Sequence, residues 1–269
     1  MIFAKKSLGQ HFLRSERALT EIIQAAEITP GECILEIGPG EGVLTEKLLA
    51  YSLQVVAVEK DDNLYELLKN KFAKEIAEGK FVLVHDDILN FDPTSLQAVS
   101  YKLVANIPYN ITGAIFEKFL SATAQPSLIV LLVQDEVAKR AVARDGKESI
   151  LSISIKVYGN PRYVDKVLAG SFVPAPSVHS AILAVEDISK NFFTSFSEQD
   201  FFKLLKAGFQ SKRKKMSSNL AAVAGKEQIR EVFAALALDE NTRAEDVDKD
   251  TWHALATALL SKDNTKEGA

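Results

Sequence analysis

The sequence predicts an α/β protein in which a doubly wound, largely parallel sheet carries helices on both faces and is followed by a small all-helical domain. From residue 33 onward, short apolar runs rich in β-branched residues alternate with segments of helical periodicity. That alternation is typical of repeated βα units. After residue 186 the helical periodicity continues without a strand-like run. Because 269 residues exceed the ~100–200 of one typical domain, we expect two domains, 1–186 and 187–269.

Five short apolar runs predict the parallel strands, at 33–37, 54–58, 81–85, 101–105 and 127–133. The segments between them predict four helices, at Glu41–Tyr51, Asp61–Ala77, Thr112–Ala122 and Asp135–Ala143. Asp61 and Thr112 are the expected N-cap residues, because their side-chain oxygens can accept hydrogen bonds from the first helical turn. Two further strand-like stretches, Ile150–Val157 and Val178–Val185, are expected to add an antiparallel edge to the sheet. The second domain is expected to contain helices at Glu198–Gln210, Lys212–Val223, Glu227–Leu236 and Lys249–Leu260.

The composition excludes several classes of protein. No apolar run approaches the ~18–20 residues that span a bilayer, and the first residues lack the pattern of a secretory signal, so we expect a cytoplasmic protein without a membrane partner. The single cysteine, Cys33, lies in an apolar run and is expected to be an inert core thiol. The four histidines, His11, His85, His179 and His253, show no ligand spacing. No metal site is predicted.

Charge is distributed unevenly along the chain. A formal net charge of −4 and a pI of about 5.7 argue against a nucleic-acid partner, since phosphate contacts depend on Lys and Arg. One stretch, which we call the basic segment, has six basic residues and no acidic one: Lys203, Lys206, Lys212, Arg213, Lys214 and Lys215. Such a run is commonly a solvated helix face, and it is also the kind of surface that contacts a phosphate backbone.

A glycine-rich turn, Gly38-Pro39-Gly40-Glu41-Gly42, joins the first predicted strand to its helix. Ligands bind at this position in open α/β sheets, and glycine lets the backbone approach them closely. Glu59 ends the second strand and could accept hydrogen bonds from both ribose hydroxyls of an adenosyl group, while Asp87, after the third strand, could contact its adenine amine. Each feature also occurs as an ordinary turn, strand end or cap. A dinucleotide-binding loop is disfavoured because Val43 stands where that motif has its third glycine.

The fourth predicted strand runs into Asn106-Ile107-Pro108-Tyr109. The exocyclic amine of adenine is a poor nucleophile because its lone pair is delocalised into the ring. The Asn106 side-chain oxygen and the backbone carbonyl of Ile107 or Pro108 could bind the amine hydrogens, so that positioning rather than a strong base promotes attack on a methyl sulfonium. Tyr109 would stack on the base, and Phe172, in a later loop, would cover its other face. The alternative is a simple turn that ends the strand.

Taken together, these segments resemble the ribosomal RNA adenine N6-dimethyltransferase family, in particular its small-subunit (16S) members. The similarity covers most of the chain and includes Lys5–Leu13, Glu36–Gly42, Glu59, Asp87, Asn106–Tyr109, Phe172–Ser180 and Phe209–Leu220. It implies a Rossmann-like class I methyltransferase sheet and S-adenosylmethionine as the cofactor. The resemblance implies cofactor contacts for Gln10, His11, Leu13, Gly38, Gly40, Glu59, Asp87 and Asn106, and catalytic roles for Asn106, Pro108, Tyr109 and Phe172.

The resemblance also implies a substrate. This would be two adjacent adenosines in a hairpin loop near the 3′ end of small-subunit rRNA, each methylated twice, within the 30S subunit or its precursor. The basic segment would then contact rRNA, and the helical domain would recognise the shape of the subunit. We expect the protein to act as a monomer. Asp86 departs from the family, in which glycine commonly stands at this position, and the departure bears on the adenine contact of Asp87.

Three alternatives remain open. A large-subunit (23S) rRNA adenine methylase of the antibiotic-resistance type shares nearly every pocket motif, although the Phe209–Leu220 and Phe172–Ser180 segments favour the small-subunit enzyme. A non-catalytic ribosome-assembly factor would bind rRNA and retain the pocket for folding, but it has no need of Asn106–Tyr109. A nicotinamide oxidoreductase would bind NADH in the glycine-rich turn.

Overall fold

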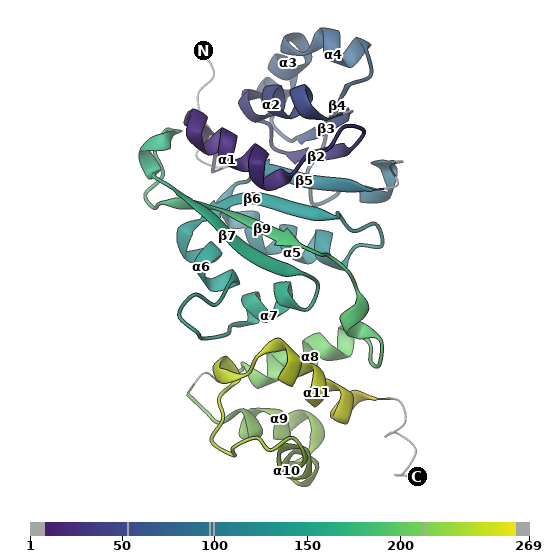
Figure 1. Ribbon diagram of the computed structural model, residues 1–269, viewed down its shortest axis with the longest axis vertical. Helices are drawn as coiled ribbons and strands as arrows, with labels where there is room; N and C mark the ends of the chain where they lie inside the picture. The colour runs from purple at the N-terminus through teal and green to yellow at the C-terminus, as the bar shows by residue number, and fades with distance from the viewer. Residues whose placement is uncertain (1–8, 53, 97, 99, 212, 262–269) are drawn as a thin grey trace. The chain divides into compact units, whose positions relative to one another are not determined.

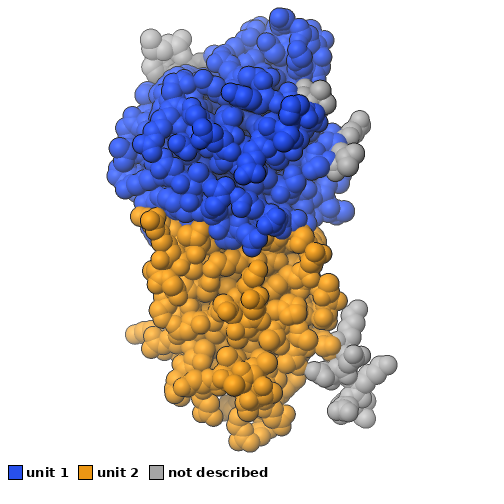
Figure 2. Space-filling model, viewed as in Figure 1, with its two compact units in different colours: residues 1–138, 160–188 blue, residues 139–159, 189–269 orange. Residues whose placement is uncertain are grey.

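The computed structural model describes residues 9–261 apart from 53, 97, 99 and 212, and the chain divides into two compact units. Unit 1 contains the residues up to 138 and residues 160–188, and unit 2 contains 139–159 and the residues from 189 onward (Figure 2). The last boundary lies close to the division expected at 187. The sequence pattern did not predict that residues 139–159 belong to unit 2. Within unit 2, the N–H of Glu148 donates to the carbonyl of Glu245 at 2.8 Å, so this segment packs with the C-terminal part of the chain.

Unit 1 is built on a seven-stranded sheet with the order β4-β3-β2-β5-β6-β9-β7 (Figure 1). Its strands are β2 (Cys33–Ile37), β3 (Gln54–Glu59), β4 (Phe81–His85), β5 (Tyr101–Asn106), β6 (Leu128–Gln134), β7 (Asn160–Val167) and β9 (Ser180–Glu186). The five strands from β4 to β6 are parallel. An antiparallel edge follows, formed by β9, which overlaps the predicted strand Val178–Val185, and by β7, which was not predicted. The order reverses between β2 and β5, so the loops after these two strands open onto one crevice.

Helices cover both faces of this sheet, as predicted. They are α1 (Glu16–Ala26), α2 (Val43–Tyr51), α3 (Asp62–Lys71), α4 (Ala73–Ala77) and α5 (Thr112–Ser121). A further helix, α6 (Asp135–Ala141), follows β6 and includes the boundary at 138 between the two units. On one face, Val104 of β5 belongs to an apolar cluster with Leu19 of α1 and Leu48 of α2. Leu103, which points to the other face, is also fully buried, and α5 lies on the side of the sheet away from α1 (Figure 1). Burial on both faces explains why the strands are almost uninterrupted apolar runs.

One strand prediction is wrong, because Ile150–Val157 contains the helix α7 (Ile150–Lys156). The alternation of Ile and Ser along this stretch resembles that of a strand. However, the Ser149 hydroxyl accepts from the N–H of Ser152, and the Ser152 hydroxyl accepts from the N–H of Ser149. This reciprocal capping box starts a helix. The strand of this region is β7, and Pro161 is tolerated within it because β7 is an edge strand.

The two predicted N-caps differ in outcome. Asp61 does cap α3, since its carboxylate accepts from the N–H groups of Asn63 and Leu64. Thr112 does not cap α5. It is the first helical residue, and its hydroxyl donates to the carbonyl of Tyr109 at 3.0 Å. The reason is that a short 3-10 turn, Tyr109–Ile111, leads into α5.

Besides α7, unit 2 contains α8 (Glu198–Gly208), α9 (Met216–Ala224), α10 (Lys226–Ala235) and α11 (Lys249–Leu260). These four helices lie where the sequence predicted helices, with α9 starting later than expected. Helices α8 and α11 approach closely at Gly208, where an added Cβ would lie 2.4 Å from the buried ring of Trp252. No helix in the described part of the chain has the length and apolar character needed to cross a membrane.

Candidate active site

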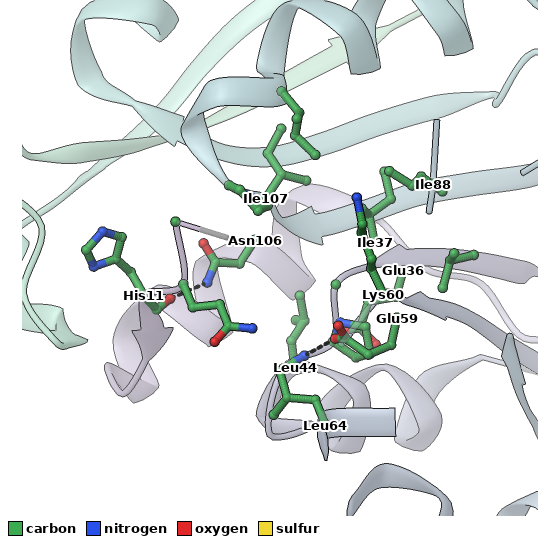
Figure 3. A pocket seen from close by; sticks show the side chains of 18 of the residues that line it. His11, Glu36, Ile37, Leu44, Glu59, Lys60, Leu64, Ile88, Asn106 and Ile107 are labelled. Carbon is green, nitrogen blue, oxygen red and sulfur yellow. Dashed lines mark hydrogen bonds between the residues drawn. The ribbon is translucent and has the colours of Figure 1, made fainter. Parts of the chain in front are cut away.

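A cavity of about 270 Å³ opens at the carboxyl ends of the parallel strands of unit 1 (Figure 3). The predicted site residues that line it are Gln10, His11, Leu13, Gly38, Gly40, Glu59, Asp87, Asn106, Pro108 and Tyr109. His11 and Asn106 lie at one end, and Glu59 and Lys60 lie at the other (Figure 3). We call the first the target end (His11 and Asn106–Tyr109), because Asn106–Tyr109 are predicted to hold the target amine, and the second the cofactor end (Gly38, Gly40, Glu59 and Asp87). His11 lies at the target end although its own predicted contact is with the cofactor. The loops after β2, β3, β4 and β5 therefore meet at one crevice.

The turn between β2 and α2 has a backbone conformation that glycine adopts readily. Gly38 and Gly40 have φ angles of 59° and 60°, in the left-handed region. The N–H of Gly38 donates to the carbonyl of Val58 at 2.9 Å, which ties the turn to the end of β3. A Cβ on Gly40 would lie 3.2 Å from the ring of Phe12. Glycine is needed here both for the turn itself and for close packing of the N-terminal segment.

Gly42 has a role that the sequence did not reveal. Its φ is 79°, it precedes the first residue of α2, and an added Cβ would lie 2.5 Å from Cε2 of Phe72. Close helix packing, which a dinucleotide-binding loop achieves with its third glycine, is achieved here one position earlier than Val43. The shifted glycine spacing was the signal that could have identified this contact.

Glu59 ends β3 and is 5% exposed. Its Oε1 accepts from the N–H of Asp61 at 2.8 Å, and its Oε2 accepts from the N–H of Gly40 at 3.4 Å. Burial raises the pKa of this carboxyl, and the two N–H donors oppose that effect. A carboxylate has about four acceptor positions, so lone pairs remain for hydroxyl groups of a ligand in the cavity.

Glu36, which the sequence marked only as part of a motif, forms a buried pair with Thr45. The Thr45 hydroxyl donates to Glu36 Oε2 at 2.7 Å, and Glu36 is 1% exposed although it contributes to the cavity wall. Burial raises the pKa of Glu36 to about 8, the hydrogen bond from Thr45 opposes the rise, and the neighbouring Glu59 adds to it. At neutral pH Glu36 is therefore mostly protonated.

Asp87 follows β4 and is held by two donors. Lys60 Nζ donates to its Oδ2 at 2.8 Å, and the N–H of Leu89 donates to its Oδ1 at 3.0 Å. The hydrogen bond from Lys60 holds the pKa of Asp87 below its usual range. Asp86 accepts from the N–H of Asp87 at 2.7 Å. Both aspartates line the cavity, so the departure at position 86 does not remove Asp87 from the wall.

The segment 9–13 lines the cavity beside Asn106, and the resemblance implied cofactor contacts for Gln10, His11 and Leu13 within it; residues 5–8 of that motif lie outside the described residues. It contains β1 (Phe12–Leu13), which pairs antiparallel with β8 (Phe172–Val173). The His11 ring is hydrogen-bonded through Nδ1 to the carbonyl of Pro174 at 2.7 Å. These contacts hold Gln10, His11 and Leu13 against the cavity.

Asn106, the last residue of β5, is tied to this segment. Its Nδ2 donates to the main-chain carbonyl of His11 at 3.1 Å (Figure 3). This contact uses the amide nitrogen, so the amide oxygen remains as an acceptor. Nearby, the carbonyl of Pro108 accepts a long hydrogen bond, 3.3 Å, from the N–H of Ile111. The half-buried Tyr109 ring lies nearly parallel to the His11 imidazole, at 20° and with centroids 6.0 Å apart.

The stacking role expected for Phe172 is not supported. Its ring is 2% exposed, belongs to the same apolar cluster as Leu13, and does not contribute to the cavity wall. The cause is strand pairing, because Phe172 lies opposite Leu13 in the β1–β8 ladder and its side chain turns into the core. The aromatic ring that lies beside Tyr109 is that of His11.

The basic segment belongs to unit 2, at the end of α8 and in the turn before α9. Its exposed members are Lys203, Lys206, Arg213, Lys214 and Lys215, and Lys212 lies outside the described residues. Lys203 pairs with Asp200 at 2.9 Å, which reduces its contribution to the positive charge. The buried amide of Asn219 donates to the carbonyls of Gly208 and Ser211, at 2.7 and 3.3 Å, and so anchors the turn. Sequence reasoning missed Asn219 because its partners are main-chain atoms.

The described residues contain no cluster of side chains that could bind a metal ion. No three His, Cys, Asp or Glu residues gather there as a metal site requires. Cys33 is buried in β2, and burial raises the pKa of its thiol, as expected of an inert core cysteine.

The sequence is similar to those of known proteins along almost its entire length. The model of the family described as ribosomal RNA adenine dimethylase matches residues 2–260. The ribosomal RNA small subunit methyltransferase A of Dehalococcoides mccartyi is 42% identical over 256 residues, which cover 94% of this chain and 87% of that protein. The protein of the same name from Nostoc punctiforme is 38% identical and covers 96% of each chain.

Solved structures of methyltransferases have a similar fold. A dimethyladenosine transferase from Plasmodium falciparum has a TM-score of 0.79 and 25% identity, covering 91% of this chain and 96% of that one. The 23S rRNA methyltransferase ErmE has a TM-score of 0.73 at 24% identity, covering 92% and 99%, and supports the fold alone. With the cavity described above and a family match from residue 2 to residue 260, the chain belongs to the ribosomal RNA adenine dimethylase family.

Proposed function

We propose that this protein transfers methyl groups from S-adenosylmethionine to the exocyclic N6 of two adjacent adenosines in a hairpin near the 3′ end of small-subunit rRNA, giving dimethyladenosines during ribosome biogenesis. One observation carries the proposal: the predicted cofactor residues and Asn106–Tyr109 line the same cavity. The relatives named small subunit methyltransferase A, at 42% and 38% identity, favour this substrate over large-subunit rRNA.

The cofactor end suits an adenosyl group. Gly38 and Gly40 present backbone to the cavity, and Glu59 has acceptor positions available for ribose hydroxyls. Asp87, held by Lys60, would accept from the adenine amine. The proposed contacts of the methionine portion are Gln10, His11 and Leu13. When bound, S-adenosylmethionine would supply a methyl group on a sulfonium, and an amine nitrogen can attack that methyl carbon with the neutral thioether as the leaving group.

The target end suits an adenine amine. The Asn106 amide oxygen would accept one amine hydrogen and the Pro108 carbonyl the other, which draws the nitrogen lone pair out of conjugation. Tyr109 would support the face of the base. The nitrogen–carbon bond forms as the carbon–sulfur bond breaks, and the nitrogen then releases one proton. Holding the amine in line with the methyl group supplies much of the rate.

The exposed members of the basic segment are proposed to contact rRNA phosphates. Replacing Arg213 and Lys214 by Gln should weaken binding to small-subunit RNA and lower the slope of log affinity against log salt by about 1 per lost phosphate contact. Cofactor affinity should not change. Lys226 and Arg230, exposed on α10, give a matched control pair. If both pairs weaken binding equally, the basic segment has no special role.

Methyl transfer from labelled S-adenosylmethionine tests the proposed function. Undermethylated 30S subunits and naked 23S rRNA are offered separately, and the nucleosides are then analysed. We expect dimethyladenosine from the 30S subunits only. Label in the 23S rRNA would instead support the large-subunit methylase, and binding of subunits without label in either RNA would support a non-catalytic assembly factor.

A further inference from the structure

Tyr109 is fixed by a contact outside the cavity. Its hydroxyl oxygen lies 2.6 Å from Oγ of Ser180, a residue 71 positions later, and either oxygen can be the donor. Burial raises the pKa of the Tyr109 hydroxyl, so this group keeps its proton over the physiological range. The hydrogen bond is therefore present under the conditions in which the enzyme would work.

Ser180 is a rigid anchor. It is the first residue of β9 and is 0% exposed. In the sheet it lies between two neighbours, Gln134 of β6 and Val167 of β7. It does not contribute to the cavity wall, so its side chain can act on a bound ligand only through another residue.

We propose that Ser180 is a positioning residue for methyl transfer: its hydroxyl holds the Tyr109 ring in the direction on which the target adenine stacks. The inference rests on the proposed function, because it takes Tyr109 as the stacking surface. It also gives a role to the last residue of the Phe172–Ser180 segment, which the sequence analysis identified without a role for its serine.

The geometry explains what the hydrogen bond can control. The phenolic oxygen lies on the axis of ring rotation, so a hydrogen bond there does not stop rotation about χ2. It does stop the whole ring from swinging about χ1, because such a swing moves the oxygen away from Ser180. A base stacked on the ring would follow any swing, and a displacement of about 1 Å at a reacting group can cost on the order of 10²-fold in rate.

Three variants test this inference with 30S subunits as methyl acceptor. Ser180→Ala and Tyr109→Phe each remove one side of the hydrogen bond and keep the stacking ring. Each should lower kcat by about tenfold, because the ring is held less firmly. KM for S-adenosylmethionine should stay within about twofold, since the cofactor end is untouched. The double variant should be no slower than either single variant, because both remove the same contact.

Tyr163→Phe is the matched control. The Tyr163 hydroxyl donates to Asp135 at 2.7 Å in the same unit, and Tyr163 does not contribute to the cavity wall. This variant should lose thermal stability to a similar degree as Ser180→Ala and keep the wild-type kcat. If Tyr163→Phe lowers kcat as much as Ser180→Ala, the effect is a general loss of stability and the positioning role is wrong.

A crystal structure of the Ser180→Ala variant separates this inference from the proposed function. We expect the Tyr109 ring to occupy a different or a second χ1 rotamer. An unmoved ring with wild-type kcat, or losses in the two single variants that multiply in the double variant, would overturn the inference. If wild-type protein leaves 30S subunits unmethylated while the ring still moves, the proposed function fails and Ser180 stands as the anchor of a ring with another ligand.

Discussion

The two ends of the cavity are held by contacts that span very different distances along the chain. At the cofactor end, Glu59 accepts from Asp61, two residues later, and from Gly40, nineteen residues earlier. Asp87 accepts from Leu89, two residues later. Each of these contacts lies within one βα unit or between neighbouring units.

At the target end the contacts reach much further. Asn106 donates to a residue 95 positions away, Tyr109 is bonded to one 71 positions away, and His11 is bonded to one 163 positions away. A short motif can therefore specify the cofactor end, whereas the target end needs the antiparallel edge of the sheet and the N-terminal segment in place. Changes at the cofactor end should alter ligand affinity, and changes at the target end should alter turnover.

Asn106→Ala should give the largest effect. It removes the acceptor for the amine and the donor to His11, so kcat should fall on the order of 10²–10³-fold while affinity for S-adenosylhomocysteine changes by less than about tenfold. Single-turnover methylation and calorimetric titration measure the two quantities. Asn70→Ala, which truncates an amide bonded to Glu66 on α3, is the control. Equal losses of turnover and of affinity for S-adenosylhomocysteine would contradict the division of the cavity into a cofactor end and a target end.

The pH dependence of stability tests the protonation of Glu36, beside the glycine-rich turn, without any substrate. Burial raises the pKa of Glu36 from 4.5 to about 8, so the folded state binds this proton more tightly than the unfolded chain does. Its stabilising contribution is complete below pH 4.5 and is lost as pH rises through about 8. The free energy of unfolding should fall by up to about 1.4 kcal/mol per pH unit from this group.

Urea titrations between pH 5 and 8 measure this slope. Glu36→Gln should make it shallower, because the amide keeps an acceptor for Thr45 and has no proton to lose, while Glu59, whose pKa is also raised, still contributes. Glu66→Gln, exposed on α3, should leave the slope as in the wild type. An unchanged slope in Glu36→Gln would mean that another group titrates.

Glu59→Gln should weaken binding and spare turnover. Loss of a charged acceptor for ribose hydroxyls should raise the Kd of S-adenosylhomocysteine by about 10–100-fold, and kcat at saturating cofactor should stay within about threefold. Glu66→Gln again serves as the control. A fall in kcat with unchanged Kd would contradict the assignment of Glu59 to cofactor binding.

Lys60→Met should have the smallest effect. The Lys60 side chain is 60% exposed, and pairs of this kind contribute little. The Kd of S-adenosylhomocysteine should rise by at most about fivefold, with a difference that shrinks at high salt. A loss as large as that in Glu59→Gln would show that Asp87 depends on Lys60 for its orientation.

The same contrast explains how much could be predicted from the sequence. Local patterns predicted the parallel strands, the glycine-rich turn and Asn106–Tyr109. In the structure the strands form as predicted, and the turn and Asn106–Tyr109 line one cavity at their carboxyl ends. Gly42 is a partial exception, because its close contact with Phe72 was visible only as a shift in glycine spacing.

Several features that depend on distant partners, and the cap of α7, were not predicted. Phe172 turns into the core because β8 pairs with β1. Residues 150–156 form a helix because Ser149 caps it, although their apolar period is that of a strand. The hydroxyl of Ser180 and the amide of Asn219 acquire partners only after folding, since neither contact leaves a pattern in the neighbouring sequence.

A crystal structure of the protein with S-adenosylhomocysteine tests the division of the cavity most directly. We expect the ribose hydroxyls within about 2.6–3.2 Å of the Glu59 carboxylate and the sulfur facing Asn106. A ligand whose ribose lies away from Glu59, or whose sulfur points away from Asn106, would contradict the account.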